Sequence, residues 1–339
     1  MEYRYIGRSG LRVSPVCMGT MTFGSQCDEK NAFAIMDKAY DAGVNFFDTA
    51  ELYPVPPEEK LAGLTEEMVG RWLKTKPRES IILASKVAGA ASGWFVPPIR
   101  HGYTACDRFH IERAVEGSLK RLGTDYLDLY QMHWPDTVVP IEETMRAFDA
   151  LVQSGKVRYI GTSNDTARGT MKSLMVSKYE KLARFESIQN NFSLLNRRDL
   201  TEIGALCREE NISLLPYSPL GGGVLSGKYN QAFIDPKSRF GEYLHAKESR
   251  QKAMYHRFVN DKTLKATAKY LEIAKKYDMH PVTLAVSWSM HFDFVASTII
   301  GARYANQLEV SFKALEIKLS AEILNECEKV QKEILYPMG

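Results

Sequence analysis

The stretch LDLYQMHWPDTVVPIEETMRAFDALVQSGKVRYIGTSN, residues 127–164, contains two apolar runs separated by a helical pattern. The runs are LDLYQMH (127–133) and RYIGTS (158–163), and both have the composition of buried strands. The apolar residues that repeat at helical spacing between them are Met145, Phe148, Leu151 and Val152. Gly155 follows where a glycine readily ends a helix. The stretch therefore predicts a strand–helix–strand unit.

The same alternation continues on both sides of this unit. The other apolar runs are CMGTM (17–21, the weakest), VNFFDT (44–49), IILASK (81–86), FESIQN (185–190), ISLLPY (212–217) and ASTIIG (296–301). Their apolarity is continuous rather than alternating, which is typical of parallel strands covered on both faces. Eight such strands alternating with helices predict an α/β fold, a single (β/α)8 TIM barrel.

The first residues carry a different pattern. RYIGRSGLRVS (4–14) predicts a β-hairpin that turns at Ser9-Gly10 and plugs the bottom of the barrel. The chain has 339 residues, of which 45% are hydrophobic, and one barrel commonly fills this length. We therefore expect residues 1–339 to form one domain, with long loops on the C-terminal face of the barrel.

Composition argues against several classes of partner. The formal net charge is only +3, and the Lys and Arg residues are scattered, so neither nucleic acid nor a membrane surface is indicated. Five cysteines without metal or disulfide spacing favour free thiols in a reducing compartment. No apolar run has the length of a signal core or a membrane span. We expect a cytoplasmic protein with a small-molecule substrate, and a homo-oligomer is compatible with the sequence.

Polar residues gather where the predicted strands end. They are Asp48, Lys86, His133, Ser163, Asn164, Gln189, Tyr217 and Ser218. In a barrel of parallel strands these ends share one face, and that face holds the active site. We therefore expect these side chains to surround one opening.

Four residues of this region have the chemistry needed to reduce a carbonyl group. A tyrosine has a pKa near ~10 and is a poor acid at neutral pH, but a nearby ammonium group favours the phenolate and eases release of the proton. Tyr53 and Lys86 supply this pair, Asp48 can keep the lysine charged, and His133 can donate a hydrogen bond to the substrate oxygen. Each residue alone also fits a structural role, but their convergence on one face favours catalysis.

Several motifs in one order support this interpretation. They are FDTAELY (47–53), ASKV (84–87), LYQMHWPD (129–136), GTSN (161–164), IQNNFSLLNR (188–197), YSPLGGGVLSGKY (217–229) and IGARYANQLE (300–309). With them the sequence resembles the aldo-keto reductases over essentially the whole chain. YPVPPEEKLAGLTEE (53–67), LNR (195–197) and YP (336–337) are similar to bacterial Tas-type NADP-dependent oxidoreductases within that family.

The resemblance implies NADPH-dependent reduction of aldehydes or ketones. Tyr53 looks like the general acid, Lys86 and Asp48 like the pair that tunes it, and His133 like the residue that orients the carbonyl. The positions that match NADP(H)-binding residues of the family are Thr20, Ser163, Asn164, Gln189, Tyr217, Ser218, Pro219, Leu220, Gly222, Gly227, Lys228, Arg239, Gly301, Arg303, Gln307 and Ser311.

Within this set, particular contacts are implied. Ser163, Asn164 and Gln189 resemble the residues that bind the nicotinamide carboxamide, and Tyr217 resembles the ring that stacks on the nicotinamide. The stretch 218–228 resembles the loop that wraps the pyrophosphate.

The same loop also looks like a P-loop, but Tyr229 stands where a Ser or Thr should bind magnesium. Arg303 matches the adenosine-end motif, and its charge suits a 2′-phosphate. Two positions depart from the commoner family pattern. Ser311 replaces an Asn that faces the adenine, and Pro54 replaces a Gly after the tyrosine.

The substrate side is less defined. The long loop 87–109 contains Trp94, Phe95 and Tyr103, and Trp134 follows His133. Together they predict an aromatic pocket for bulky or aromatic carbonyl compounds, although the same aromatics could simply pin the loop to the barrel. Residues 229–260 are expected to fold over the cofactor as a lid, with Lys237 or Arg239 near phosphate.

Two other functions remain open from the sequence. Relatives that resemble potassium-channel β subunits use the same fold as a cofactor-sensing regulatory partner with slow chemistry, and the four catalytic residues do not exclude that role. A metal-dependent hydrolase is disfavoured, because the strand ends offer His133 and Asp48 but no second convergent histidine. We therefore expect no metal.

Overall fold

A computed structural model describes residues 1–92 and 103–338. At its centre lies an eight-stranded sheet in the order β11-β10-β9-β8-β5-β4-β3-β12, and its neighbouring strands pair in parallel. The strands are β3 (Val16–Gly19), β4 (Phe46–Asp48), β5 (Ile82–Val87), β8 (Leu127–Met132), β9 (Val157–Ser163), β10 (Phe185–Gln189), β11 (Ser213–Leu214) and β12 (Thr298–Ile300). Bridges from Leu214 to Val295 and from Tyr217 to Ile299 join the two edges. This confirms the predicted (β/α)8 barrel.

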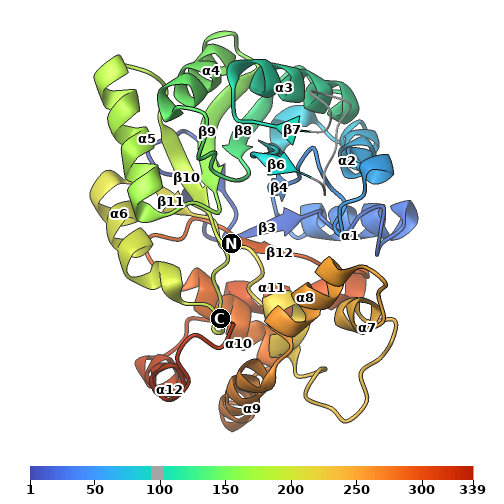
Figure 1. Cartoon of the computed structure of the whole chain (residues 1–339). Helices are drawn as coiled ribbons and strands as arrows, with labels where there is room; N and C mark the ends of the chain where they lie inside the picture. The colour runs from blue at the N-terminus through green and yellow to red at the C-terminus, as the bar shows by residue number, and fades with distance from the viewer. Residues whose placement is uncertain (93–102, 339) are drawn as a thin grey trace.

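Helices surround the strands, as Figure 1 shows. The helices of the first half are α1 (Glu29–Asp41), α2 (Leu64–Leu73), α3 (Arg108–Leu122), α4 (Ile141–Gln153), α5 (Ala167–Glu180) and α6 (Glu202–Glu210). Those of the second half are α7 (Arg239–Leu244), α8 (Ser249–Phe258), α9 (Asp261–Lys276), α10 (Pro281–Met290), α11 (Leu308–Phe312) and α12 (Ala321–Glu333). The predicted lid region thus contains two helices, α7 and α8.

The amino-terminal hairpin closes the end of the barrel where the strands begin. β1 (Arg4–Tyr5) pairs antiparallel with β2 (Arg12–Val13), as predicted. Ile6, Leu11 and Val13 are buried in one cluster with residues of the barrel interior, among them Phe46 and Leu129. The hairpin therefore leaves the other end of the barrel open, and the polar residues at the ends of the strands lie there.

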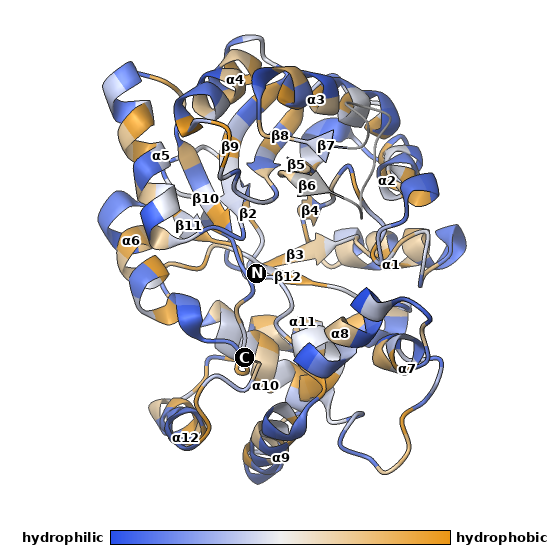
Figure 2. Ribbon diagram, viewed as in Figure 1, coloured by the Kyte–Doolittle hydropathy of each residue, from blue (hydrophilic) through white to orange (hydrophobic). Residues whose placement is uncertain are grey.

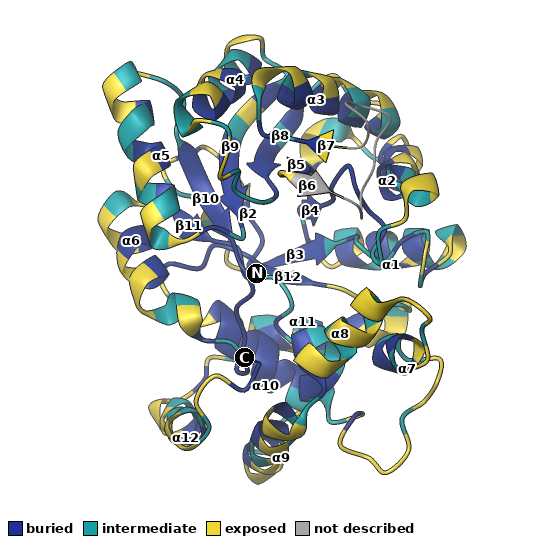
Figure 3. Cartoon of the chain, viewed as in Figure 1, coloured by how far each residue is buried: buried dark blue, intermediate teal, exposed yellow. Residues whose placement is uncertain are grey.

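A second apolar layer lies between the strands and the helices. Figure 3 shows that the strands of the barrel are mostly buried, whereas the outer faces of most helices are exposed, and Figure 2 shows hydrophilic residues on these outer faces. α10 differs, because all residues from Val282 to Met290 are buried. α2 and α3 approach backbone to backbone: a Cβ on Gly70 would lie 2.4 Å from the carbonyl oxygen of Arg121. No helix in the described part of the chain combines the length and apolarity needed to cross a membrane.

The described part of the predicted long loop 87–109 contains a second small hairpin. β6 (Ala91–Ser92) pairs antiparallel with β7 (Tyr103–Thr104). Trp94 and Phe95, which we expect to line a substrate pocket, lie outside the described residues.

Candidate active site

The four residues predicted to be catalytic lie together at the barrel mouth. Asp48 ends β4, Lys86 lies near the end of β5, and His133 directly follows β8, the next strand of the sheet. Lys86 Nζ is 2.5 Å from Asp48 Oδ1 and 3.3 Å from the hydroxyl of Tyr53, which returns from the loop after β4. The Tyr53 and His133 rings are nearly perpendicular, with centroids 5.7 Å apart.

Lys86 is charged although it is fully buried. Burying an ammonium group is unfavourable unless the group is paired and hydrogen-bonded. Besides Asp48, Lys86 donates to the carbonyl oxygen of Thr49 at 2.8 Å. Burial lowers the pKa of Lys86, but Asp48 and Tyr53 raise it by more, so the pKa lies above its usual 10.5. The site therefore holds a fixed positive charge against the phenol.

The pKa of Tyr53 changes in the opposite net direction to the one that the sequence argument implies. Burial raises the pKa of Tyr53 above its usual 10, and Lys86 lowers it only in part, with Asp48 adding to the increase. The ammonium group favours the phenolate, but burial opposes it, and only 8% of Tyr53 is exposed. The phenol is consequently protonated throughout the neutral range.

Two glutamines complete the surroundings of Asp48. Its Oδ2 atom accepts from Gln131 Nε2 at 3.1 Å and from Gln189 Nε2 at 2.9 Å. Gln189 was expected to meet a nicotinamide carboxamide, and here its amide nitrogen contacts Asp48 and Gln131. Gln131 was not predicted, although it lies on β8 two positions before His133, and in an extended chain this spacing places both side chains on one face.

His133 is held as a neutral imidazole. Burial and the charge of Lys86 keep the pKa of His133 well below its usual 6.5. Its Nδ1 atom has no hydrogen-bond partner among the described residues. The ring stacks on Trp134 with centroids 3.9 Å apart and planes at 14°. A neutral imidazole carries one N–H donor, which suits a substrate oxygen beside the phenol.

The residues expected to hold the nicotinamide lie next to His133. Asn164 Nδ2 donates to the carbonyl oxygen of His133 at 2.9 Å, and the Tyr217 hydroxyl donates to Asn164 Oδ1 at 2.7 Å. Ser163 Oγ donates to the carbonyl oxygen of Gln189 at 2.7 Å. Asn164 and Ser218 have φ angles of 53° and 54°, which are uncommon outside glycine and occur often at functional sites.

The glycine-rich loop after Tyr217 has a backbone suited to an anion. Gly221, Gly222 and Gly223 all have positive φ, at 55°, 66° and 100°. A Cβ on Gly223 would lie 3.1 Å from Lys228 Nζ, so a cation rests against this turn. Successive backbone N–H groups in such turns form concavities for phosphate. The backbone of this loop and the adjacent Lys228 therefore fit a phosphate group, as expected of a dinucleotide site.

The aldo/keto reductase family model matches residues 15–332. The chain belongs to that family. "Protein tas" of Escherichia coli (strain K12) is 38% identical, and the alignment covers 99% of each chain. "Uncharacterized oxidoreductase YrpG" of Bacillus subtilis (strain 168) is 36% identical over 96% of this chain and 94% of its own. "Probable voltage-gated potassium channel subunit beta" of Oryza sativa subsp. japonica is 34% identical over 97% and 96%. The family and the oxidoreductase relatives support an oxidoreductase.

In this aldo/keto reductase, the residues expected at the adenosine end form hydrogen bonds, most of them with residues that are distant in the sequence. Arg303 Nε donates to the carbonyl oxygen of Gln26 at 2.8 Å, and its Nη2 donates to Glu242 Oε1 at 2.8 Å. Arg239 Nε donates to Gln26 Oε1 at 3.1 Å. Gln307 Oε1 accepts from the backbone N–H of Arg303 at 2.8 Å. Gln26 and Glu242 were not expected here, because only the folded chain brings them to Arg303.

The remaining expected cofactor residues lie in several different elements. Thr20 is buried, and its Oγ1 donates to the carbonyl oxygen of Asp48 at 2.9 Å. Gly227 has a φ of 83°, and Ser311 is buried in α11. Gly301 directly follows β12, while Pro219 and Leu220 precede the glycine turn.

Of the expected substrate residues that are described, Trp134 is half-buried and Tyr103 is mostly exposed.

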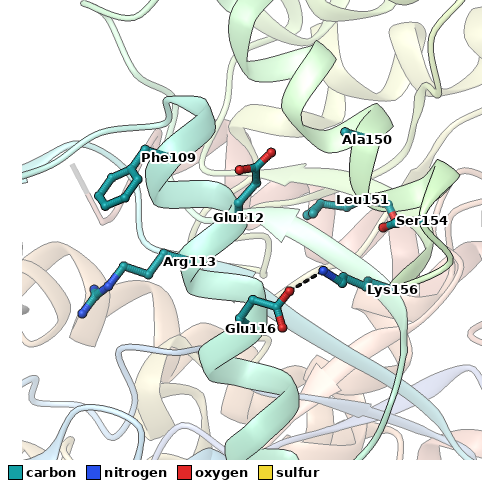
Figure 4. A pocket seen from close by; sticks show the side chains of 8 residues that line it. All are labelled: Phe109, Glu112, Arg113, Glu116, Ala150, Leu151, Ser154 and Lys156. Carbon is teal, nitrogen blue, oxygen red and sulfur yellow. Dashed lines mark hydrogen bonds and ion pairs between the residues drawn. The ribbon is translucent and has the colours of Figure 1, made fainter.

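A separate open groove lies on the outside of the barrel between α3 and α4, as Figure 4 shows. Glu112, Glu116 and Lys156 line it, and Lys156 forms an ion pair with Glu116. Its charged lining does not resemble a carbonyl-binding pocket. Across residues 1–92 and 103–338, no group of three His, Cys, Asp or Glu side chains is placed to hold a metal ion.

Proposed function

We propose that this protein is an NADPH-dependent reductase that converts aldehydes or ketones into alcohols. The observation that carries the proposal is the Tyr53 hydroxyl 3.3 Å from the Lys86 ammonium group, which is itself paired with buried Asp48. A protonated phenol beside a fixed cation is a proton donor whose anion is stabilised where it forms. Membership of the family supports oxidoreductase chemistry at this site.

Each residue has one task in the proposed reaction. A bound nicotinamide cofactor supplies the hydride that forms the new C–H bond at the carbonyl carbon. Tyr53 donates its hydroxyl proton to the carbonyl oxygen, which completes the alcohol, and it regains a proton from water afterwards. Lys86 stabilises the phenolate in between, and Asp48 keeps Lys86 charged. His133 orients the carbonyl oxygen through an N–H donor.

Arg303 supports NADPH rather than NADH as the cofactor. Its guanidinium group lies between Gln26 and Glu242, at the end of the site where the family binds the adenosine. A charge-assisted contact with a phosphate contributes about 1.5–3 kcal/mol. Arg303→Ala should therefore weaken NADPH binding by roughly tenfold or more and leave NADH binding within about twofold. Equal weakening for both cofactors, measured by fluorescence titration, would contradict this assignment.

The proposed reaction is tested with a panel of aliphatic, aromatic and bulky aldehydes and ketones. Oxidation of NADPH is followed for each compound and repeated with NADH. We expect turnover with at least one aldehyde and a preference for NADPH. No oxidation across the panel, with a protein that binds NADPH, would reject the proposal.

The buried, unpaired state of all five cysteines supports the further proposal of a reducing, cytoplasmic location.

The second candidate is a cofactor-binding regulatory subunit with slow turnover. It is favoured by the similarity to the Oryza sativa protein named as a probable potassium-channel β subunit. A stable complex with a different protein, together with negligible turnover across the panel, would favour this role over the reductase.

A further inference from the structure

The catalytic position of Tyr53 depends on the short segment that connects it to β4. This segment, residues 49–53, runs beside the end of β5. The N–H of Thr49 donates to the carbonyl oxygen of Ala84 at 2.9 Å, and the N–H of Glu51 donates to that of Lys86 at 3.3 Å. The backbone hydrogen bonds from this segment to β5 thus end at Glu51, two residues before the phenol. Tyr53 itself is bonded through its backbone to Ala50 and Gly63, at 3.1 Å each, and not to β5.

The Glu51 side chain adds a hydrogen bond between this segment and the residue that follows β5. Its Oε1 atom accepts from the backbone N–H of Ala88 at 2.5 Å. The carboxylate is 8% exposed, so this contact is shielded from water and charge-assisted. Ala88 and Tyr53 belong to one small apolar cluster with Ala50 and Leu52. Glu51 therefore links the segment to a residue that packs with the phenol.

A buried histidine on α3 lies next to the Glu51 carboxylate. His110 Nε2 is 3.5 Å from Glu51 Oε1, and only 2% of the residue is exposed. Neither ring nitrogen makes a hydrogen bond within the described part of the chain. The backbone N–H of His110 donates to the side chain of Asp107, the N-cap residue of α3, so this bond fixes the backbone that carries the imidazole. Because either tautomer of a neutral imidazole has one N–H group, Glu51 is an acceptor within its reach.

We propose that Glu51 is a positioning residue that sets the distance between the Tyr53 hydroxyl and Lys86 Nζ, with His110 holding its carboxylate in place. The inference rests on the proposed function, in which Tyr53 is the proton donor. The hydrogen bond of the Glu51 side chain goes to the Ala88 N–H and not to the side chains of Tyr53, Lys86 or Asp48. It acts through Ala88 and the segment 49–53. Small displacements of a proton donor reduce the rate strongly while leaving ligand binding intact.

The first test compares Glu51→Ala with Glu51→Gln. Glu51→Ala should lower kcat about 10- to 100-fold, the loss typical of a displacement near 1 Å, with KM and the NADPH Kd within about threefold. Glu51→Gln retains an oxygen acceptor for the Ala88 N–H and should keep kcat within about threefold of wild type. If Glu51→Ala does not fold, His110→Leu takes its place, with an expected loss of about fivefold in kcat.

Glu66→Gln is the matched control, because Glu66, in α2, is also a buried carboxylate. It accepts from Ser85 Oγ at 2.6 Å and from Arg121 Nε at 2.7 Å, and these bonds lead away from residues 49–53. This variant should lower Tm and leave kcat unchanged. An unchanged kcat in the Glu51→Ala enzyme, or an equal loss of kcat in Glu66→Gln, would overturn the inference.

A crystal structure of Glu51→Ala gives a readout that does not depend on activity. The separation of the Tyr53 hydroxyl from Lys86 Nζ should increase from 3.3 Å to beyond about 4 Å, outside hydrogen-bond range. An unchanged separation would reject the positioning role. If the wild-type protein reduces no carbonyl compound, the proposed function fails, and this measurement still decides whether Glu51 positions Tyr53.

Discussion

Lys86→Met removes the central charge of the site while keeping a side chain of similar length. In the variant, Asp48 retains the amide donors of Gln131 and Gln189 but loses the cation 2.5 Å away. Asp48 and Lys86 are 2% and 0% exposed, so water cannot replace the lost partner without opening the barrel mouth. Removing one partner of a buried ion pair costs about 3–5 kcal/mol of folding free energy.

This loss converts into a measurable change in Tm. A chain of 339 residues gains about 0.7 kcal/mol/K of entropy on unfolding, at roughly 2.1 cal/mol/K per residue. Tm should therefore fall by about 4–7 °C. Calorimetry of the wild type and the variant, in the same buffer without cofactor, measures the change.

The companion variant is Asp48→Asn combined with Lys86→Met, which removes both charges. Because no unpaired charge remains buried, it should recover most of the lost stability and unfold within about 1–2 kcal/mol of wild type. Both variants should lack turnover, so stability and catalysis are separated. A single variant that unfolds at the wild-type Tm, or a double variant less stable than the single one, would refute the reasoning about the buried pair.

Two further predictions concern pH and packing. Reduction requires protonated Tyr53, whose pKa is raised above 10, and neutral His133, whose pKa lies well below 6.5. The kcat/KM for reduction should thus stay level across the neutral range and fall only as pH rises past about 10; a profile with its midpoint near pH 8 would contradict the two assignments. Gly70→Ala places a Cβ 2.4 Å from the Arg121 carbonyl oxygen and should cost about 1–3 kcal/mol in thermal unfolding. Gly117→Ala on α3, which meets only the flexible end of the Arg121 side chain, is its control and should be neutral or slightly stabilising, so equal losses would argue against the close approach.

The fold was predictable because its signals are local. The apolar runs mark the barrel strands, and the polar residue that ends each run lies at the mouth as a direct result of parallel pairing. Ser9-Gly10 likewise identified the hairpin that plugs the barrel. Strand lengths were less accurate. The run 212–217 yields only Ser213–Leu214 as a strand, because Pro216 has no N–H to donate, and Tyr217 pairs with Ile299 as an isolated bridge.

The parts of the site that escaped prediction depend on burial and on contacts between distant residues. The net pKa change of Tyr53 reflects its burial, which no short motif reports. Gln26 accepts a hydrogen bond from Arg303, which lies 277 positions away in the sequence. Glu51, in the loop after β4, lies 3.5 Å from His110 of α3. Gln131 is the exception, since its spacing from His133 already places it on the inner face.

The central claim is that the Tyr53 hydroxyl supplies the proton in carbonyl reduction. It is tested most directly by comparing the kcat of Tyr53→Phe with that of wild type on one accepted aldehyde, alongside the NADPH Kd of both proteins. We predict a loss of about 10²- to 10⁴-fold in kcat with an unchanged Kd, because only the proton donor is removed. A variant that reduces the aldehyde at the wild-type rate would contradict the account.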